Sequence, residues 1–324
     1  MDILIAEKMA GPALERLKTD FKVSAEPELW RDQARLLAVV RETRALIVRN
    51  QTQVTAELIA AAPNLQVIGR AGVGLDNIDV PACTKAGVVI VSTPDQNSIS
   101  VAELAIGMML GLGRMLPLAD RHTKGGGWDR QKFVGVELYG KTLGLVGLGR
   151  IGVLTALRAR GLGMKIIAHD NYVNPDSFAV TETQARLVPL DELLKTADFV
   201  SCHVPLTPAT KHLFNYERFS LMKPEAFFLN LARGEVVNEA DLARALQEKK
   251  LAGAALDVRE QEPARPGPLD TMDNVLLTPH IAAFTREGQA RVNAAVCADV
   301  ARVLRGERPN NFVNLPKPAR LQPA

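Results

Sequence analysis

The 324-residue sequence contains only three cysteines, Cys83, Cys202 and Cys297, which lie far apart and form no C-x-x-C pair. Disulfide frameworks and zinc sites need paired or clustered cysteines, so the sequence predicts neither a disulfide scaffold nor a metal site. A chain with so few, unpaired thiols fits a reducing compartment, and we therefore expect a cytoplasmic protein.

Long runs of charge of one sign are also lacking. The 39 basic and 36 acidic residues leave a formal net charge of +3, and the basic residues are scattered along the chain. Binding to nucleic acid or to an anionic membrane surface needs concentrated positive charge. Neither partner is therefore expected.

No segment has the features of a signal peptide or of a membrane span. The N-terminal stretch MDILIAEKMAG has no basic region before its apolar residues, which is typical of a first β-strand. The most apolar stretch, residues 101–118, contains Glu103, Arg114 and Pro117 and barely reaches the length needed to cross a bilayer. We expect a buried helix there and no membrane association.

Short runs of Val, Ile and Leu alternate with helical patterns along most of the chain, which predicts an α/β fold with parallel sheets. A first series of strands and helices is followed by one long apolar helix at residues 98–121, and a second series begins at residue 141. Asn238 is the expected cap of a helix in the second series. A last helix near residues 287–305 precedes a Pro-rich tail whose end we expect to be disordered.

Residues 141–170 are the most informative stretch, because they read strand, glycine turn, helix and strand, and end on an acid. Gly147, Gly149 and Gly152 form G-x-G-x-x-G directly behind the apolar run LGLV. In dinucleotide-binding folds the first glycine permits a tight turn, and the second lets the backbone approach a pyrophosphate. The third brings the following helix close to the sheet, with its N-terminal N–H groups facing the phosphates. Since strand and helix stand in the required order, we predict that this stretch binds a dinucleotide.

The acid that closes this stretch, Asp170, bears on the choice of cofactor. Its carboxylate stands at the distance where it can bind the two hydroxyls of a ribose. It would repel a 2′-phosphate, and no arginine follows it in Asn171, Tyr172 or Val173. The sequence therefore favours NAD over NADP.

Further polar residues follow predicted strands, at the sheet edge where ligands bind in open parallel sheets. They are Arg233, His203, His280, and Asp257 with Glu262 five residues on. An arginine fork can hold a carboxylate or a carbonyl, a histidine can move a proton, and an acid can orient and charge the histidine. Each is also compatible with a packing or surface role. Position alone does not decide which histidine matters.

Longer stretches resemble the D-isomer-specific 2-hydroxyacid dehydrogenases, and among these most of all the phosphoglycerate dehydrogenases. The matching stretches include GRAGVGLDNIDVPACTKAGVVIVSTP, CHVPLTPATKHL, NLARGEVVNEADLARALQ and TPHIAAFT. The resemblance implies two Rossmann-like or flavodoxin-like domains with parallel sheets. The substrate domain would be discontinuous, at residues 1–97 and 288–324, and the NAD-binding Rossmann domain would span residues 98–287.

The same resemblance assigns roles to individual residues. Arg233, Glu262 and His280 match the family's active site, and His203 falls at a cofactor-side position, so His280 becomes the expected proton carrier. The positions that it assigns to the NAD site are Val73, Gly147, Gly149, Arg150, Ile151, Gly152, Asp170, His203, Val204, Pro205, Thr210, Leu231, Ala232 and Asp257. The backbone expected to meet the substrate carboxylate belongs to Ala71, Gly72, Val73 and Gly74.

Four basic residues suggest that the substrate carries a second anion. Arg49 and Arg70 end predicted strands of the first domain, and Arg130 and Lys132 match basic positions near the substrate phosphate in phosphoglycerate dehydrogenases, in the same or a partner subunit. Ordinary surface cations are the alternative. We expect phosphate rather than sulfonate, and hence interconversion of 3-phosphoglycerate and 3-phosphohydroxypyruvate by a homodimer.

Other functions remain open within and beyond the family. The alternatives are a glyoxylate or hydroxypyruvate reductase, another 2-hydroxyacid dehydrogenase such as one acting on sulfolactate, and an NADH-sensing binding protein like the corepressors that share this fold. Formate dehydrogenases of the superfamily carry glutamine where Glu262 stands, which argues against that activity. The sequence shows no match to the regulatory extension of serine-controlled relatives, so feedback by serine is not expected.

Overall fold

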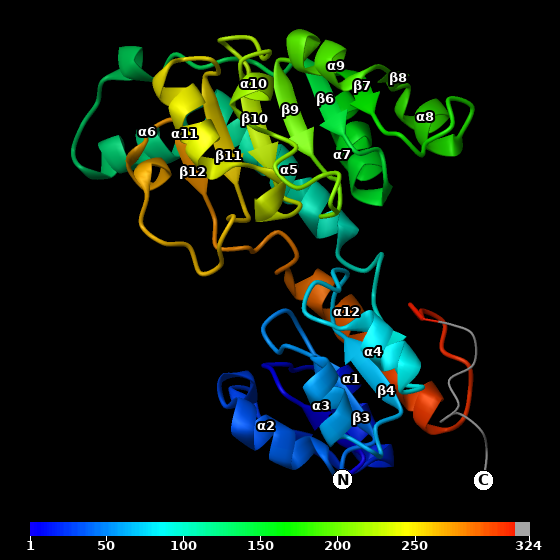
Figure 1. The fold of residues 1–324 in the computed structure, drawn as a ribbon. Helices are drawn as coiled ribbons and strands as arrows, with labels where there is room; N and C mark the ends of the chain where they lie inside the picture. Colours follow the sequence, from blue (N-terminus) through cyan, green and yellow to red (C-terminus); the bar gives the residue numbers. More distant parts are fainter. Residues whose placement is uncertain (315–324) are drawn as a thin grey trace. The chain divides into compact units, whose positions relative to one another are not determined.

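The computed structural model of the chain describes residues 1–314, which divide into two compact units (Figure 1). Of the described residues, the first unit comprises residues 1–97 and 285–314, and the second comprises residues 98–284. Each contains one sheet whose strand pairs are all parallel. The predicted α/β fold with two parallel sheets is therefore confirmed. The tail end that we expect to be disordered, from residue 315 on, lies outside the described residues.

The first unit has a five-stranded sheet. Its strands are β1 (Ile3–Ile5), β2 (Val23–Ala25), β3 (Ala45–Val48), β4 (Val67–Arg70) and β5 (Val89–Val91). Its helices are α1 (Pro12–Asp20), the 3-10 helix η1 (Leu29–Arg31), α2 (Gln33–Val40), α3 (Ala56–Ala61), α4 (Val80–Lys85) and α12 (Arg286–Leu304). The strand order β2-β1-β3-β4-β5 is that of flavodoxin-like folds.

Helices cover both faces of this sheet, which explains why its strands are continuous apolar runs. Successive residues of a strand point to opposite faces. Ile3 and Ile5 therefore belong to one hydrophobic cluster, with residues of α1 and α12, and Leu4 belongs to another, with residues of α2, α3 and α4. The helix α12 is capped by Thr285, whose hydroxyl accepts a hydrogen bond from the amide of Gly288. The domain boundary predicted between residues 287 and 288 therefore falls inside the first turn of this helix.

The second unit has a seven-stranded sheet. Its strands are β6 (Thr142–Val146), β7 (Lys165–His169), β8 (Arg186–Leu187), β9 (Phe199–Cys202), β10 (Phe227–Asn230), β11 (Gly253–Leu256) and β12 (Val275–Leu277). Its helices are α5 (Ser98–Gly113), α6 (Leu116–Lys124), η2 (Arg130–Phe133), α7 (Arg150–Gly161), α8 (Phe178–Thr183), α9 (Leu190–Thr196), α10 (Tyr216–Phe219), η3 (Gly234–Val236), α11 (Glu239–Gln247) and η4 (Pro268–Thr271). The order β12-β11-β10-β9-β6-β7-β8 is the Rossmann order extended by one strand.

Residues 98–121, predicted to form one helix, form two. Helix α5 ends at Gly113, and Met115 then adopts a left-handed conformation at φ 49° before α6 begins. Pro117 lies in the first turn of α6, where the N–H that it lacks is not needed. The carbonyl of Gly113, which a continuous helix would pair with residue 117, instead accepts from the amide of Val136 at 2.8 Å. The prediction of one helix was wrong because this proline starts a new helix.

The cap predicted for α11 is confirmed, since the side chain of Asn238 accepts a hydrogen bond from the amide of Asp241 at 3.1 Å. Within residues 1–314, no single helix is long and apolar enough to cross a membrane. The pair α5 and α6, bent by 61°, meets the requirement by length and composition alone. In its own unit, α5 packs against α7 (Figure 1). It contributes Met108 and Met109 to the hydrophobic core.

Candidate active site

The loops that follow the strands of the second unit carry most of the predicted site residues. Because these strands are parallel, their carboxyl ends lie along one edge of the sheet. The chain runs outward from β6 to β7 and β8, and then returns to place β9 on the other side of β6. In doubly wound folds, ligands bind outside the carboxyl ends at such a switch in strand order.

The glycine turn between β6 and α7 has the geometry that its motif predicts. Gly147 has a left-handed φ of 101°, and a Cβ there would lie 2.8 Å from the carbonyl oxygen of His203. A Cβ at Gly152 would lie 2.3 Å from the carbonyl oxygen of Gly147. At Gly149, the N-cap of α7, nothing lies within 4 Å of a Cβ position. The outer two glycines therefore permit close packing, and the middle one leaves open space before the helix N-terminus.

Asp170, directly after β7, is bound to the backbone of the glycine turn. One carboxylate oxygen accepts from the amide of Leu148 at 2.9 Å, and the other from the amides of Tyr172 at 2.8 Å and Val173 at 3.2 Å. A carboxylate offers about four lone-pair sites, so about one remains for a ligand hydroxyl. Asp170 therefore shapes the turn in addition to the ribose contact predicted for it.

These features fit a dinucleotide, since no atom crowds Gly149 at the N-terminus of α7 and Asp170 is bound to the same turn. The other residues predicted for the cofactor in this unit lie on the segments that follow β6, β9 and β10: Arg150, Ile151, His203, Val204, Pro205, Thr210, Leu231 and Ala232. In the segment after β9, the hydroxyl of Thr210 donates to the carbonyl of Pro205 at 2.6 Å and accepts from the amide of Thr207 at 2.7 Å. That threonine thereby holds the loop in a tight turn.

His280 and Glu262, predicted as parts of the active site, are in direct contact. The Nδ1 atom of His280 lies 2.7 Å from Oε2 of Glu262, and the two side chains are 34% and 35% exposed. His280 follows β12 with a left-handed φ of 54°, and its amide donates to the carbonyl of Asp257 at 2.7 Å. The imidazole is thus held beside a carboxylate while remaining accessible to solvent.

The carboxylate of this pair stays ionised. Burial raises the pKa of Glu262, but the hydrogen bond and the charge of His280 lower it. The amide of Arg259 and the charge of Arg233 lower it further, so that the net pKa of Glu262 lies below its ordinary value. A negative charge therefore faces His280 at neutral pH.

Arg233 follows β10 on a turn that Asn230 organises. The Asn230 side chain is fully buried, donates to the carbonyl of Arg233 at 2.8 Å and accepts from the amide of Ala232 at 3.0 Å. The half-buried Arg233 donates through Nη1 to the carbonyl of Ala232 at 2.8 Å. Because its charge also lowers the pKa of Glu262, Arg233 and the His280–Glu262 pair belong to one electrostatic neighbourhood.

Asp257 anchors the loop that carries His280. Its side chain is 1% exposed, and one oxygen accepts from the hydroxyl of Thr278 at 2.6 Å and the amide of Ile281 at 2.8 Å. The other oxygen accepts from the amide of Ala282 at 2.9 Å. The resemblance assigned Asp257 to the NAD site, whereas its contacts in the structure fix the chain on both sides of His280.

The two strand-end histidines have opposite environments. His203 has its Nε2 atom 2.9 Å from the Ser201 hydroxyl, and its Nδ1 atom is buried without a hydrogen-bond partner among the described residues. Burial lowers the pKa of His203 from 6.5 to about 4. A third histidine, His212, for which the sequence indicated no special setting, lies with Nε2 2.6 Å from Oε1 of Glu260. Only His280, of these three, pairs with a predicted catalytic acid.

In the first unit, Arg49 directly follows β3 and is oriented by an acid that sequence analysis missed. Glu7, after β1, is 4% exposed and accepts from the amide of Arg49 at 2.7 Å and the amide of Gln51 at 3.2 Å. It also accepts from the amide and hydroxyl of Thr52 at 3.0 and 2.8 Å. The signal was present in the sequence, since Glu7 follows an apolar strand just as the other strand-end residues do.

Arg70 and the turn after it, at residues 71–74, are folded together. The Arg70 side chain is 8% exposed and donates through Nη1 to the carbonyl of Ala71 at 3.0 Å. Gly72 has φ 155°, and a Cβ there would lie 2.1 Å from that Nη1 atom. Val73, next in the turn, is 40% exposed, and Gly74 is half-buried. Glycine at residue 72 thus leaves room for the guanidinium.

Arg130 and Lys132 are exposed residues of η2, and Lys132 Nζ lies 3.7 Å from a carboxylate oxygen of Asp129. They belong to the second unit, whereas Arg49 and Arg70 belong to the first. A common anion site for the four cations therefore stays a prediction.

Comparison with known proteins extends over nearly the whole chain. The D-3-phosphoglycerate dehydrogenase of Methanocaldococcus jannaschii is 45% identical over 314 residues, which are 97% of this chain and 59% of that protein. The chain thus spans about three fifths of the length of that relative. The crystal structure of the TT0316 protein from Thermus thermophilus has a TM-score of 0.91 and 35% identity, covering 97% of this chain and 100% of that one.

A second solved structure, D-lactate dehydrogenase from Aquifex aeolicus in complex with NAD and lactic acid, has a TM-score of 0.84 and 30% identity, covering 98% of this chain and 100% of that one. Residues 106–282 match the family described as "D-isomer specific 2-hydroxyacid dehydrogenase, NAD binding domain". The matched segment includes the glycine turn, Arg233, Glu262 and His280. The chain belongs to the D-isomer specific 2-hydroxyacid dehydrogenase family.

Proposed function

We propose that the chain is an NAD-dependent dehydrogenase that interconverts a D-2-hydroxy acid and the corresponding 2-oxo acid. The observation that carries the proposal is the contact between His280 and Glu262, at 2.7 Å, in the same unit as a G-x-G-x-x-G turn with open space at Gly149. A proton carrier and a dinucleotide site together are what hydride exchange at a hydroxyl-bearing carbon needs. Membership of the family supports the same chemistry.

Each side chain of the site has a role in this proposal. The glycine turn before α7 would hold NAD, which when bound would supply the hydride chemistry. The guanidinium of Arg233 holds the substrate carboxylate and polarises the reacting oxygen. His280 donates a proton from Nε2 to that oxygen during reduction and removes it during oxidation, because Nδ1 is occupied by Glu262.

The environment of His203 supports the choice of His280 as the proton carrier. With its pKa lowered to about 4, His203 is neutral at pH 7 and has no extra proton to donate. The carboxylate of Glu262, whose pKa is held below its ordinary value, remains ionised at that pH and faces the imidazole of His280.

For the substrate, we propose 3-phosphoglycerate and its 2-oxo product, and hence a place in serine biosynthesis. The support is the 45% identity to the M. jannaschii D-3-phosphoglycerate dehydrogenase, together with the cations Arg49, Arg70, Arg130 and Lys132. A bare carboxylate needs fewer donors, since Arg233 and backbone N–H groups already serve it. A second anionic group on the substrate accounts for the excess.

A cytoplasmic homodimer is the assembly that we propose. Large apolar side chains are exposed on the segment from α6 to the start of β6, where Leu116 is 54%, Trp128 80%, Val134 73% and Tyr139 78% exposed. Burial of these side chains against a second copy would remove apolar surface from water. The three cysteines are free and buried, which suits a reducing compartment.

The proposal is tested by oxidation of NADH with a panel of 2-oxo acids: 3-phosphohydroxypyruvate, hydroxypyruvate, glyoxylate, pyruvate, sulfopyruvate and branched 2-oxo acids. We expect turnover, with kcat/KM highest for 3-phosphohydroxypyruvate. A higher kcat/KM for glyoxylate or pyruvate would still support the dehydrogenase activity but would contradict 3-phosphoglycerate as the substrate. NADH binding without turnover of any of them would favour an NADH-sensing binding protein instead.

A further inference from the structure

The catalytic glutamate of the proposed function lies on a segment with little regular structure. Residues 257–267 connect β11 to η4, and Glu262 is flanked by exposed neighbours on both sides. Among the described residues, its hydrogen bonds are those with the imidazole of His280 and with the amide of Arg259 at 3.2 Å. The orientation of the carboxylate therefore depends on how firmly the main chain at residue 259 is held.

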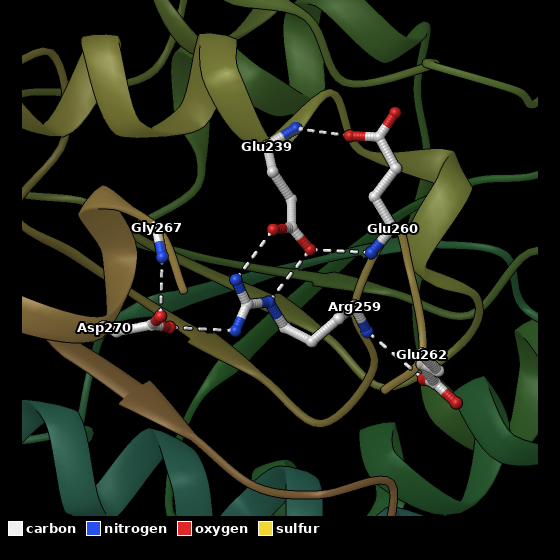
Figure 2. A network of polar contacts seen from close by, with 6 residues as sticks. All are labelled: Glu239, Arg259, Glu260, Glu262, Gly267 and Asp270. Carbon is white, nitrogen blue, oxygen red and sulfur yellow. Dashed lines mark hydrogen bonds and ion pairs between the residues drawn. The ribbon is translucent and has the colours of Figure 1, made fainter. Parts of the chain in front are cut away.

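The side chain of Arg259 turns into the protein and is only 12% exposed (Figure 2). It forms a bidentate contact with Glu239, in which Nε of Arg259 donates to Oε1 at 3.0 Å and Nη2 donates to Oε2 at 2.9 Å. Its remaining Nη1 donates to the carboxylate of Asp270 at 3.0 Å. Bidentate arginine–carboxylate pairs are among the strongest and most directional polar contacts in proteins.

Glu239 is itself fixed, because it is the first residue of α11. Its Oε1 atom also accepts from the amide of Glu260 at 2.6 Å, and its own amide donates to Oε2 of Glu260 at 3.2 Å (Figure 2). The side chain of Glu239 thus binds both the guanidinium of Arg259 and the amide of Glu260. The chain at residues 259–260 is bound to the start of a helix that packs in the core.

The peptide between Arg259 and Glu260 also lies against the turn after Arg233. A Cβ at Gly234 would lie 1.8 Å from the carbonyl oxygen of Arg259 and 2.5 Å from the amide nitrogen of Glu260. Glycine at residue 234 therefore lets the two segments approach closely. The peptide that directly follows the Arg259 amide is thus confined between the Arg233 turn and the N-terminus of α11.

We propose that Arg259 and Glu239 form a clamp that positions Glu262 for its contact with His280. The clamp acts through the amide of Arg259, which occupies Oε1 of Glu262 and leaves Oε2 directed at the imidazole. Arg259 and Glu239 are thus positioning residues that touch neither substrate nor cofactor. The inference rests on the proposed function only in its effect on turnover, since the geometry of the pair can be measured without substrate.

The test uses the 324-residue chain and two variants of it. Arg259→Met removes the guanidinium, and the double variant Arg259→Met/Glu239→Gln removes both charges, so that no buried carboxylate is left unpaired. In each we expect kcat for reduction to fall roughly tenfold, equivalent to about 1.4 kcal/mol, with KM for NADH unchanged. Thermal unfolding checks that both variants are folded at the assay temperature.

Two readouts separate positioning from a general structural effect. First, the imidazole signals of the cofactor-free protein are titrated by NMR; with five histidines, the His280 signal is assigned by its loss in His280→Asn. Its titration midpoint should move to lower pH in both variants, because Glu262 no longer faces the ring in one orientation. Arg233, whose charge acts on Glu262, and Asp257, whose carboxylate binds the loop of His280, are unchanged in both variants.

Second, Arg259→Met is combined with Glu262→Gln in one variant, and the loss of kcat is compared with that of each single variant. If the clamp acts through Glu262, then Arg259→Met causes no further loss of kcat in the Glu262→Gln background. Arg186→Met is the matched control, because it removes an exposed ion pair in which Arg186 lies 2.8 Å from Glu192. Arg186 belongs to β8, the edge strand at the opposite side of the sheet from β12. This control should change neither kcat nor the His280 titration.

Losses that multiply in the combined variant, or an unchanged His280 midpoint in Arg259→Met, would overturn the inference. The proposed function fails separately, if the wild-type protein turns over none of the 2-oxo acids. The NMR titration would still decide whether Arg259 and Glu239 hold Glu262 against His280.

Discussion

Replacing Glu262 by glutamine removes the charge that faces His280 while keeping the size of the side chain. The interaction between two titrating groups is mutual, so the imidazolium that lowers the pKa of Glu262 is itself favoured by the carboxylate. In the variant, a neutral amide replaces that charge beside the ring. Reduction, which needs the protonated ring, should lose activity at lower pH than in the wild type.

The contact geometry sets the size of the shift. A hydrogen bond to a charged group contributes about 1.5–3 kcal/mol. The two side chains are 34% and 35% exposed, so solvent screening favours the lower end, about 1.5 kcal/mol. That free energy corresponds to about one pH unit. Well below the pH limb, where the ring is protonated in both proteins, kcat/KM should be nearly equal.

The assay is kcat/KM for reduction of the best 2-oxo acid, measured with NADH from pH 5 to about 9, a range around the ordinary pKa of histidine. Glu192→Gln is the control, since it makes the same substitution in an exposed ion pair with Arg186. Its limb should coincide with that of the wild type. If the limb of Glu262→Gln also stayed in place, Glu262 would have no electrostatic role.

Three further substitutions test the other assignments. His280→Ala should lower kcat by about a hundred- to ten-thousand-fold with NADH affinity intact, whereas His203→Ala should lower it far less; equal losses in steady-state assays would contradict the choice of proton carrier. Asp170→Ala should weaken NADH binding in a fluorescence titration much more than NADPH binding, both by loss of the ribose contact and by release of the Leu148 amide; a wild type that uses the two cofactors equally would contradict the NAD preference. Arg49→Ala should reduce kcat/KM for 3-phosphohydroxypyruvate by roughly tenfold or more and spare glyoxylate, because it removes a charge-assisted contact of about 1.5–3 kcal/mol; an equal loss for both substrates would mean that Arg49 does not bind a second anion.

The sequence predicted best those features that depend on local pattern. Apolar strands separated by helices predict parallel sheets, and three glycines at fixed spacing predict a turn whose packing the structure has at Gly147 and Gly152. The family followed from long matching stretches. The roles of Arg233, Glu262 and His280 stay predictions, although the structure brings the last two into contact.

The features that escaped the sequence depend on contacts between distant segments. Nothing local to Arg259 indicates that its guanidinium will meet Glu239, twenty residues earlier, as opposed to solvent. Asp257 carries no local sign that its oxygens will bind the amides around His280. The break at Met115 was missed for another reason, because Pro117 within an apolar pattern is compatible with either a kinked helix or a new one.

The path of the chain has a consequence for its synthesis on the ribosome. The strands β1 to β5 are made first, yet one face of their sheet is covered by Val292, Val296 and Val300 of α12, which emerges only after residues 98–284. The second unit is one continuous segment and can complete its core as soon as it has left the exit tunnel. The first unit to begin is thus the last to be completed. The face of its sheet that α12 covers stays uncovered while the segment with the glycine turn and His280 is translated.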